Sequence, residues 1–184
     1  MSLNVSGSLH EIERYIKTVP DFPRAGISFK DITPLIESGQ ALHAAVDALA
    51  KAVESIEFDR IISAEARGFV LGTALAYRTR KGLILARKPN KLPRARISAT
   101  YDLEYGTDAL EVHADAIPPG ARILVTDDLL ATGGTARAMC ELVEKAGGTV
   151  ACAAFLIELS YLEGRQRLAP YPVVSLLDYN DPNA

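Results

Sequence analysis

The sequence predicts an α/β protein with a mainly parallel central sheet flanked by helices. Short apolar runs at residues 60–63, 82–86, 123–126, 150–159 and 173–177 alternate with segments whose apolar residues recur at helical spacing. The run 150–159 is apolar almost throughout, as expected for a strand that is buried on both faces. At 184 residues the chain has the size of one domain, so we expect a single domain over 1–184.

Composition narrows the classes of partner and compartment. The net charge is −3, so no global positive field exists to attract nucleic acid or an anionic membrane. Basic residues do gather between positions 78 and 96, which suggests a small polyanionic ligand. The start of the chain lacks the features of a signal peptide, and no apolar run reaches membrane-spanning length. Cys140 and Cys152 have no zinc-site spacing, so we expect reduced, buried thiols in a cytoplasmic protein.

The first third of the chain is predicted to form two helices around a turn-rich segment. Ser8 and Glu11 have the spacing of a capping box, which predicts a helix over about 9–18 that Pro20 stops. Residues 20–38 follow, rich in Pro and Gly but carrying Phe22, Ile27 and Phe29. This segment either caps the core or forms a hood that grips a flat heterocycle. A long amphipathic helix over 39–56 comes next.

Two further segments place charge where a predicted strand ends. Glu65 and Arg67 follow the strand at 60–63, and a helix then runs to about residue 80, with Gly82 as its stop signal. Arg87, Lys88 and Lys91 follow the strand at 82–86 and form either a solvated loop or an anion site. Residues 94–109 then predict an inserted hairpin, which is either a lid or a plain exposed hairpin.

The stretch from Ile123 to Ala136 carries most of the functional information. Its apolar run ends on Asp127 and Asp128, a Thr/Gly loop over 131–135 follows, and a helix is predicted from about 136 to 146. Glycines beside hydroxyls at a helix start make a cradle for an anion, most naturally a phosphate. The loop has neither the Lys of an ATP-binding loop nor the G-x-G-x-x-G of a dinucleotide site. Two preceding carboxylates suit ribose hydroxyls or Mg²⁺, so the stretch predicts a ribose-5-phosphate site, although a capped helix after an ordinary turn remains the structural alternative.

The run Asp-Asp-Leu-Leu-Ala-Thr-Gly-Gly-Thr at 127–135 resembles the phosphoribosyl-pyrophosphate (PRPP) signature of type I phosphoribosyltransferases, in the form found in their adenine branch. The resemblance implies the type I phosphoribosyltransferase fold, with a hood at about 20–38 and a flexible hairpin lid at about 94–109. It implies a homodimeric purine salvage enzyme that transfers the phosphoribosyl group of PRPP to adenine, giving AMP and pyrophosphate. It also implies a requirement for Mg²⁺, held mainly through PRPP near Asp127 and Asp128.

The same resemblance assigns roles to individual residues. The 5-phosphate is assigned to Ala131, Thr132, Gly133, Gly134 and Thr135, and the ribose to Asp127 and Asp128. Pyrophosphate is assigned to Glu65, Ala66, Arg67, Arg87, Lys88 and Lys91, and adenine to Phe29, to the main chain of Ser28 and Lys30, and to Leu129. Catalysis is assigned to Glu104, as acid/base partner of a purine nitrogen, with Tyr105 and Arg67. Asn90 stands where the family pattern has Gly, but Asn tolerates left-handed backbone, so the turn is expected to survive.

Two alternatives stay open at this point. The first is a phosphoribosyltransferase with another acceptor, such as hypoxanthine, guanine, xanthine, orotate or uracil, because the phosphate cradle reads only the sugar phosphate. The second is a regulatory PRPP sensor without turnover. The hood around Phe29 and the acid in the lid favour the adenine-specific enzyme over both.

Overall fold

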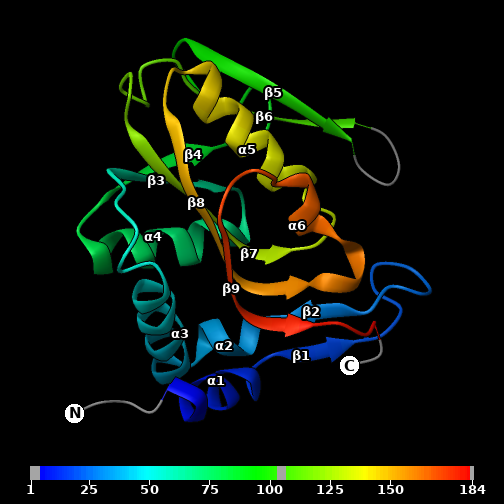
Figure 1. Ribbon diagram of the computed structural model, residues 1–184. Helices are drawn as coiled ribbons and strands as arrows, with labels where there is room; N and C mark the ends of the chain where they lie inside the picture. The colour runs from blue at the N-terminus through cyan, green and yellow to red at the C-terminus, as the bar shows by residue number, and fades with distance from the viewer. Residues whose placement is uncertain (1–4, 103–106, 183–184) are drawn as a thin grey trace.

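A five-stranded parallel sheet forms the centre of the molecule. The computed structural model describes residues 5–102 and 107–182. The strand order is β4-β3-β7-β8-β9, so the predicted mainly parallel α/β sheet is confirmed and the last strand lies at an edge, as expected (Figure 1). The strands are β3 (Arg60–Ala64), β4 (Gly82–Ala86), β7 (Arg122–Leu130), β8 (Thr149–Leu159) and β9 (Val173–Tyr179).

Helices cover both faces of this sheet. Helices α3 (Gly39–Ala52) and α4 (Arg67–Thr79) pack on one face; α5 (Gly134–Lys145) and the hairpin of β5 (Arg96–Asp102) and β6 (Thr107–His113) pack on the other (Figure 1). Side chains of β7 alternate between the two layers, as strand geometry requires. Ile123 and Val125 join the core under α5 and the hairpin, whereas Leu124 joins the core under α3 and α4. The central strand is therefore buried on both faces.

The hood is a separate two-stranded ribbon fixed to the end of β9. Helix α1 (Val5–Glu13) precedes β1 (Lys17–Val19), which pairs antiparallel with β2 (Phe29–Asp31), and α2 (Thr33–Glu37) follows. Lys30 of β2 is only 1% exposed. Its Nζ donates a hydrogen bond to Thr18 Oγ1 at 2.9 Å and lies 4.1 Å from the centre of the Tyr179 ring. Burial lowers the pKa of this lysine. The buried side chain thereby anchors the hood against the sheet.

Three predicted boundaries in the first half of the chain need correction. The first helix covers Val5–Glu13 rather than 9–18, because residues 17–19 pair with β2 and this tertiary pairing overrides the local helical pattern. The long helix ends at Ala52 rather than at residue 56. Gly82 is not the helix stop: Arg80 closes α4 in the left-handed conformation (φ 56°), and Gly82 begins β4.

The central stretch also differs from the expectation in one respect. Strand β7 does not end at the carboxylates but continues through them to Leu130, because β8 stays paired with it up to Glu158. Helix α5 consequently begins at Gly134, two residues earlier than predicted. The predicted helical turn near residue 164 is present as α6 (Gly164–Arg167), after a 3₁₀ turn η1 (Ser160–Leu162).

Both cysteines are free and buried, and burial raises the pKa of Cys140 to about 12 and that of Cys152 to about 11. They are therefore protonated, unreactive core residues.

Within the described part of the chain, no helix has the length and apolar character to cross a membrane.

Candidate functional site

A cavity of about 570 Å³ opens at the carboxyl ends of β3 and β7, the edge at which α/β proteins bind ligands. It brings together twelve of the residues that the sequence singles out, from three segments that are separate in the sequence. These are Glu65, Ala66, Arg67, Lys88, Asp127, Asp128, Leu129, Ala131, Thr132, Gly133, Gly134 and Thr135. The lining also includes Gly68, Tyr101, Asp108, Leu110, Leu130 and Ala136.

Asp127 and Asp128 place two carboxylates side by side in this cavity. Burial, together with the negative charge of Asp128, raises the pKa of Asp127 well above its ordinary value. Asp128 is 5% exposed, and its Oδ2 lies 2.9 Å from Arg67 Nε, although without the angle of a hydrogen bond. Two carboxylates therefore face the guanidinium of Arg67, and a bound cation or a set of hydroxyl donors would stabilise their charged forms.

Helix α4 starts unusually close to this carboxylate pair. A Cβ atom at Gly68 would lie 2.4 Å from Asp127 Oδ1 and 2.8 Å from Ser63 Oγ. A side chain there would displace those of Asp127 and Ser63, so glycine lets the first turn of α4 lie against the end of β7. This contact brings the loop at 65–67 and the carboxylates into one cavity.

The loop between β7 and α5 has the form of an anion cradle. Gly133 precedes the helix with φ +83°, and no side chain caps the first turn of α5. The N–H groups of that turn and the positive end of the helix dipole therefore face the cavity. Thr132 and Thr135 line the same space and add hydroxyl groups. A phosphate group fits this combination.

The basic loop after β4 is held by carboxylates rather than left free in solvent. Glu65 accepts a hydrogen bond from the backbone N–H of Lys88 and lies 3.3 Å from Arg87 Nη2. Asn90 has φ +66°, as the sequence suggested, and its N–H donates to Glu111 Oε2 at 3.0 Å. Both oxygens of Glu65 thus face the basic loop, which indicates that Glu65 shapes this loop instead of contacting an anion itself.

Two lining residues, Tyr101 and Asp108, escaped the sequence analysis. They face each other across the β5–β6 hairpin. Lys88 Nζ lies 2.8 Å from Asp108 Oδ2, and the Tyr101 hydroxyl lies 3.3 Å from the same oxygen. The hydrogen bond from Lys88 lowers the pKa of Asp108 and raises that of Lys88. Only the hairpin register could have revealed the pair, since neither residue belongs to a recognisable motif.

Arg67 connects the carboxylates to the hood. Its guanidinium carbon lies 4.9 Å from the centre of the Phe29 ring, and Phe22 packs edge-on against that ring at 5.1 Å. Arg67 therefore bridges Phe29 and Asp128. A flat ligand stacking on this face of Phe29 would take the place of the guanidinium.

The remaining predicted residues lie around this centre or outside the described part. Ser28 is half-buried beside Phe29, and the side chain of Lys30 points into the core, so that only its main chain remains for recognition. Lys91 is exposed at the outer end of the basic loop. Glu104 and Tyr105 lie outside the described residues, so their assignment stays a prediction.

Comparison with known proteins agrees with this geometry. The sequence pattern of the family described as phosphoribosyl transferase domain matches residues 35–171, which contain the central loop, the basic loop and the carboxylate pair. The chain belongs to this family, and its fold is that of type I phosphoribosyltransferases.

Its similar relatives are named adenine phosphoribosyltransferases. One, from Rubrobacter xylanophilus, is 69% identical over 178 residues, which cover 96% of each chain. A crystal structure of the protein from Thermoanaerobacter pseudethanolicus matches with a TM-score of 0.91 and 49% identity, covering 93% of this chain and 99% of that one. The Saccharomyces cerevisiae protein, solved with an imino-altritol bisphosphate and adenine, matches with a TM-score of 0.88 and 35% identity, covering 94% and 99%.

The carboxylate pair gives a testable link between site and stability. Because the pKa of Asp127 is raised in the folded chain, ionising this group destabilises the fold. Asp127→Asn should therefore increase the free energy of unfolding at neutral pH. The gain should be absent below the unfolded-state pKa of about 3.9 and should grow as pH rises through the higher folded-state pKa. Denaturant titrations of parent and variant across this pH range measure it.

Asp59→Asn is the control with opposite sign. Hydrogen bonds from Arg122 lower the pKa of the exposed Asp59 to about 2, so its stabilising contribution exists above the unfolded-state pKa and disappears as pH falls through the folded-state value. This variant should lose a little stability at neutral pH. A loss of stability in Asp127→Asn at pH 7 would contradict the conclusion that ionised Asp127 destabilises the fold.

Proposed function

We propose that this chain is a purine salvage enzyme that transfers the 5-phosphoribosyl group from PRPP to adenine, giving AMP and pyrophosphate. In this reaction a ring nitrogen of adenine forms a bond to the anomeric carbon, the bond from that carbon to pyrophosphate breaks, and the purine loses one proton. The observation that carries the proposal is the single cavity that the anion cradle and the carboxylate pair share, and whose lining residue Arg67 also stacks on Phe29 of the hood.

The proposal places the donor across the cavity. Its 5-phosphate would lie in the loop of residues 131–135, against the start of α5, and its ribose hydroxyls would donate to Asp127 and Asp128. The pyrophosphate end would then reach the backbone at Ala66 and the cations Lys88, Arg87 and Lys91. Fixed donors of this kind stabilise a leaving group whose negative charge grows during the reaction. Glu65 supports the basic loop from behind, as its contacts with Arg87 and Lys88 indicate.

Mg²⁺ fits the carboxylate pair. Asp128 Oδ2 is buried without a hydrogen-bond partner, and burial, together with the adjacent charge of Asp128, raises the pKa of Asp127. No group of three or more metal-binding side chains occurs among the described residues. Asp127 and Asp128 would hold the ion together with oxygens of PRPP and water, in keeping with the preference of Mg²⁺ for few protein ligands. When bound, the ion would neutralise charge on the pyrophosphate.

Adenine would stack on Phe29 after Arg67 leaves the ring. The main chain at Ser28 and Lys30 would bind the edge of the base, with Leu129 lining the floor. The burial of the Lys30 side chain supports a main-chain role for that residue. The adenine complex of the S. cerevisiae relative supports the choice of base. Release of Arg67 from Phe29 would free its guanidinium for the pyrophosphate.

Glu104 completes the proposal as the acid/base group that manages the purine proton, with Tyr105 beside it. Both residues follow β5 in the hairpin whose described part lines the cavity through Tyr101 and Asp108. Glu104→Ala should lower kcat by about 10²–10⁴-fold, the usual contribution of a positioned acid/base, with little change in PRPP affinity. Unchanged turnover in steady-state assays would remove Glu104 from the mechanism.

We further propose a cytoplasmic homodimer. The free, buried thiols suit a reducing compartment. Three large apolar side chains stay exposed on neighbouring elements: Val70 and Tyr77 on α4, and Leu85 on β4. An exposed apolar patch of this kind is typical of an interface. Light scattering should give twice the mass of the chain, and Tyr77→Glu should shift the mass toward that of one chain; a parent mass of one chain would contradict the dimer.

The decisive assay is AMP formation from PRPP and adenine, with and without Mg²⁺, beside parallel reactions with hypoxanthine, guanine and orotate. We expect Mg²⁺-dependent turnover with adenine and none with the other bases, because Phe29 and its neighbouring main chain select the acceptor. Turnover with another base instead would keep the sugar-phosphate site but refute the assignment of the hood. Binding of PRPP without turnover would favour a sensor.

A further inference from the structure

The loop of residues 131–135, called the phosphate loop below, packs against a segment about thirty residues further along the chain. Gly164, the first residue of α6, packs directly against the loop backbone. A Cβ atom at Gly164 would lie 2.0 Å from the carbonyl oxygen of Ala131, and one at Gly133 would lie 2.6 Å from the carbonyl oxygen of Gly164. The two backbones therefore touch, and only glycine at both positions permits this approach.

Space rather than backbone conformation requires glycine at position 164. Gly133 has φ +83°, which favours glycine. The φ angle of Gly164 is not in the left-handed region, so an alanine at position 164 could adopt the same backbone angles. An added methyl group there would have one effect: it would push the phosphate loop and α6 apart. This makes Gly164 a clean position for testing the contact.

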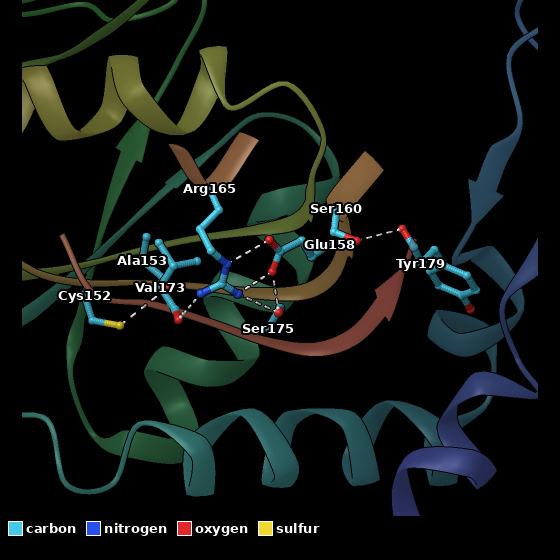
Figure 2. A network of polar contacts seen from close by, with 8 residues as sticks. All are labelled: Cys152, Ala153, Glu158, Ser160, Arg165, Val173, Ser175 and Tyr179. Atoms are coloured by element: carbon cyan, nitrogen blue, oxygen red, sulfur yellow. Dashed lines mark hydrogen bonds and ion pairs between the residues drawn. The ribbon is translucent and has the colours of Figure 1, made fainter. Parts of the chain in front are cut away.

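The next residue, Arg165, fixes α6 to the sheet. Figure 2 shows its guanidinium against Glu158 of β8 and Ser175 of β9. Arg165 Nε donates to Glu158 Oε1 at 2.9 Å, Nη2 pairs with Glu158 Oε2, and Nη1 donates to the carbonyl of Val173 at 2.8 Å. The Ser175 hydroxyl donates to Glu158 Oε2 at 2.6 Å. Both carboxylate oxygens are thus occupied in a fixed, planar arrangement.

This ion pair is buried on its acidic side. Glu158 is 4% exposed, and although burial alone would raise its pKa, hydrogen bonds from Arg165 and Ser175 hold that pKa below its usual value. A charge this deeply placed needs its partner, and the pair fixes geometry more firmly than a surface ion pair does.

The strand register places this pair beside the phosphate loop. Glu158 of β8 is the partner of Leu130, the last residue of β7 before the loop begins. One side of the loop is therefore joined to the sheet through β7. Its other side packs against Gly164. The next residue, Arg165, binds Glu158, which is the partner of Leu130 in the sheet.

We propose that Glu158, Arg165 and Gly164 form a positioning clasp that fixes the 5-phosphate loop from behind. None of the three touches the ligand in this arrangement; they act through Ala131 and Gly133. The inference rests on the proposed function, because it assigns the 5-phosphate of PRPP and AMP to that loop. It predicts a selective defect for ligands carrying the 5-phosphate.

Gly164→Ala tests the clasp most cleanly. Displacing a binding loop by about an ångström weakens productive binding strongly, so we expect the KM for PRPP and the inhibition constant for AMP each to rise about tenfold or more. The KM for adenine and the inhibition constant for pyrophosphate should not change, because neither ligand carries the 5-phosphate. Gly39→Ala is the matched control: an added methyl there meets nothing within 4 Å, so all four constants should equal those of the parent.

A second test addresses the ion pair. The double variant Glu158→Gln/Arg165→Gln removes both charges and leaves no buried charge alone, so it should fold while losing the bidentate geometry. The same selective rise for PRPP and AMP is expected. Arg122→Gln is its control, because Arg122 pairs with Glu57 and Asp59 at the amino end of β7, away from the loop.

The outcomes separate the clasp from the proposed function. Absence of AMP formation by the parent would refute the function. With an active parent, unchanged PRPP and AMP constants in Gly164→Ala would overturn the clasp, as would an equal weakening for all four ligands, which marks a general structural defect. Only the selective pattern supports it.

Discussion

The concentration of negative charge at the end of the central strand is the constraint on which the rest of the site depends. Asp127 and Asp128 are adjacent, largely enclosed and only partly neutralised by Arg67. A structure selected for stability alone would separate or replace such a pair, since a buried like-charge contact is unfavourable. On the proposed function, hydroxyl donors and a cation would arrive together with a Mg²⁺-bound sugar phosphate and make the arrangement favourable. The proposal thus explains why the chain keeps a locally unfavourable feature.

Close backbone approach is the second requirement, and three glycines satisfy it. Gly68 lets α4 meet Asp127, whereas Gly133 and Gly164 let the phosphate loop rest on α6. Each contact joins segments that are far apart in sequence, so the site is assembled by the packing of the whole domain around β7. The ion pair of the buried Glu158 with Arg165 and the buried Lys30 side chain extend this packing to α6 and to the hood. The proposed phosphate-binding loop and the proposed base-binding hood are therefore both fixed to the same central sheet.

The sequence predicted the parallel sheet and the charged segments at 65–67, 87–91 and 127–135, because these depend on local patterns: apolar runs, helical spacing and charge at strand ends. It misplaced the first helix because residues 17–19 pair with residues 29–31, a contact that local propensity does not encode. Tyr101 and Asp108 were missed because only the hairpin register sets them opposite each other. Gly164 was missed because its need for glycine arises from Ala131, more than thirty residues away. The position of Arg67 between Asp128 and Phe29 is likewise a result of packing.

The central claim is that the cavity at the end of β7 binds the sugar phosphate and that the adjoining hood binds the base. A crystal structure of the chain with AMP tests it most directly. The account predicts the 5-phosphate in the loop of residues 131–135, the ribose hydroxyls on Asp127 and Asp128, and the purine on Phe29 with Arg67 moved off the ring. A phosphate bound elsewhere, or a purine that leaves the Arg67–Phe29 stack intact, would contradict it.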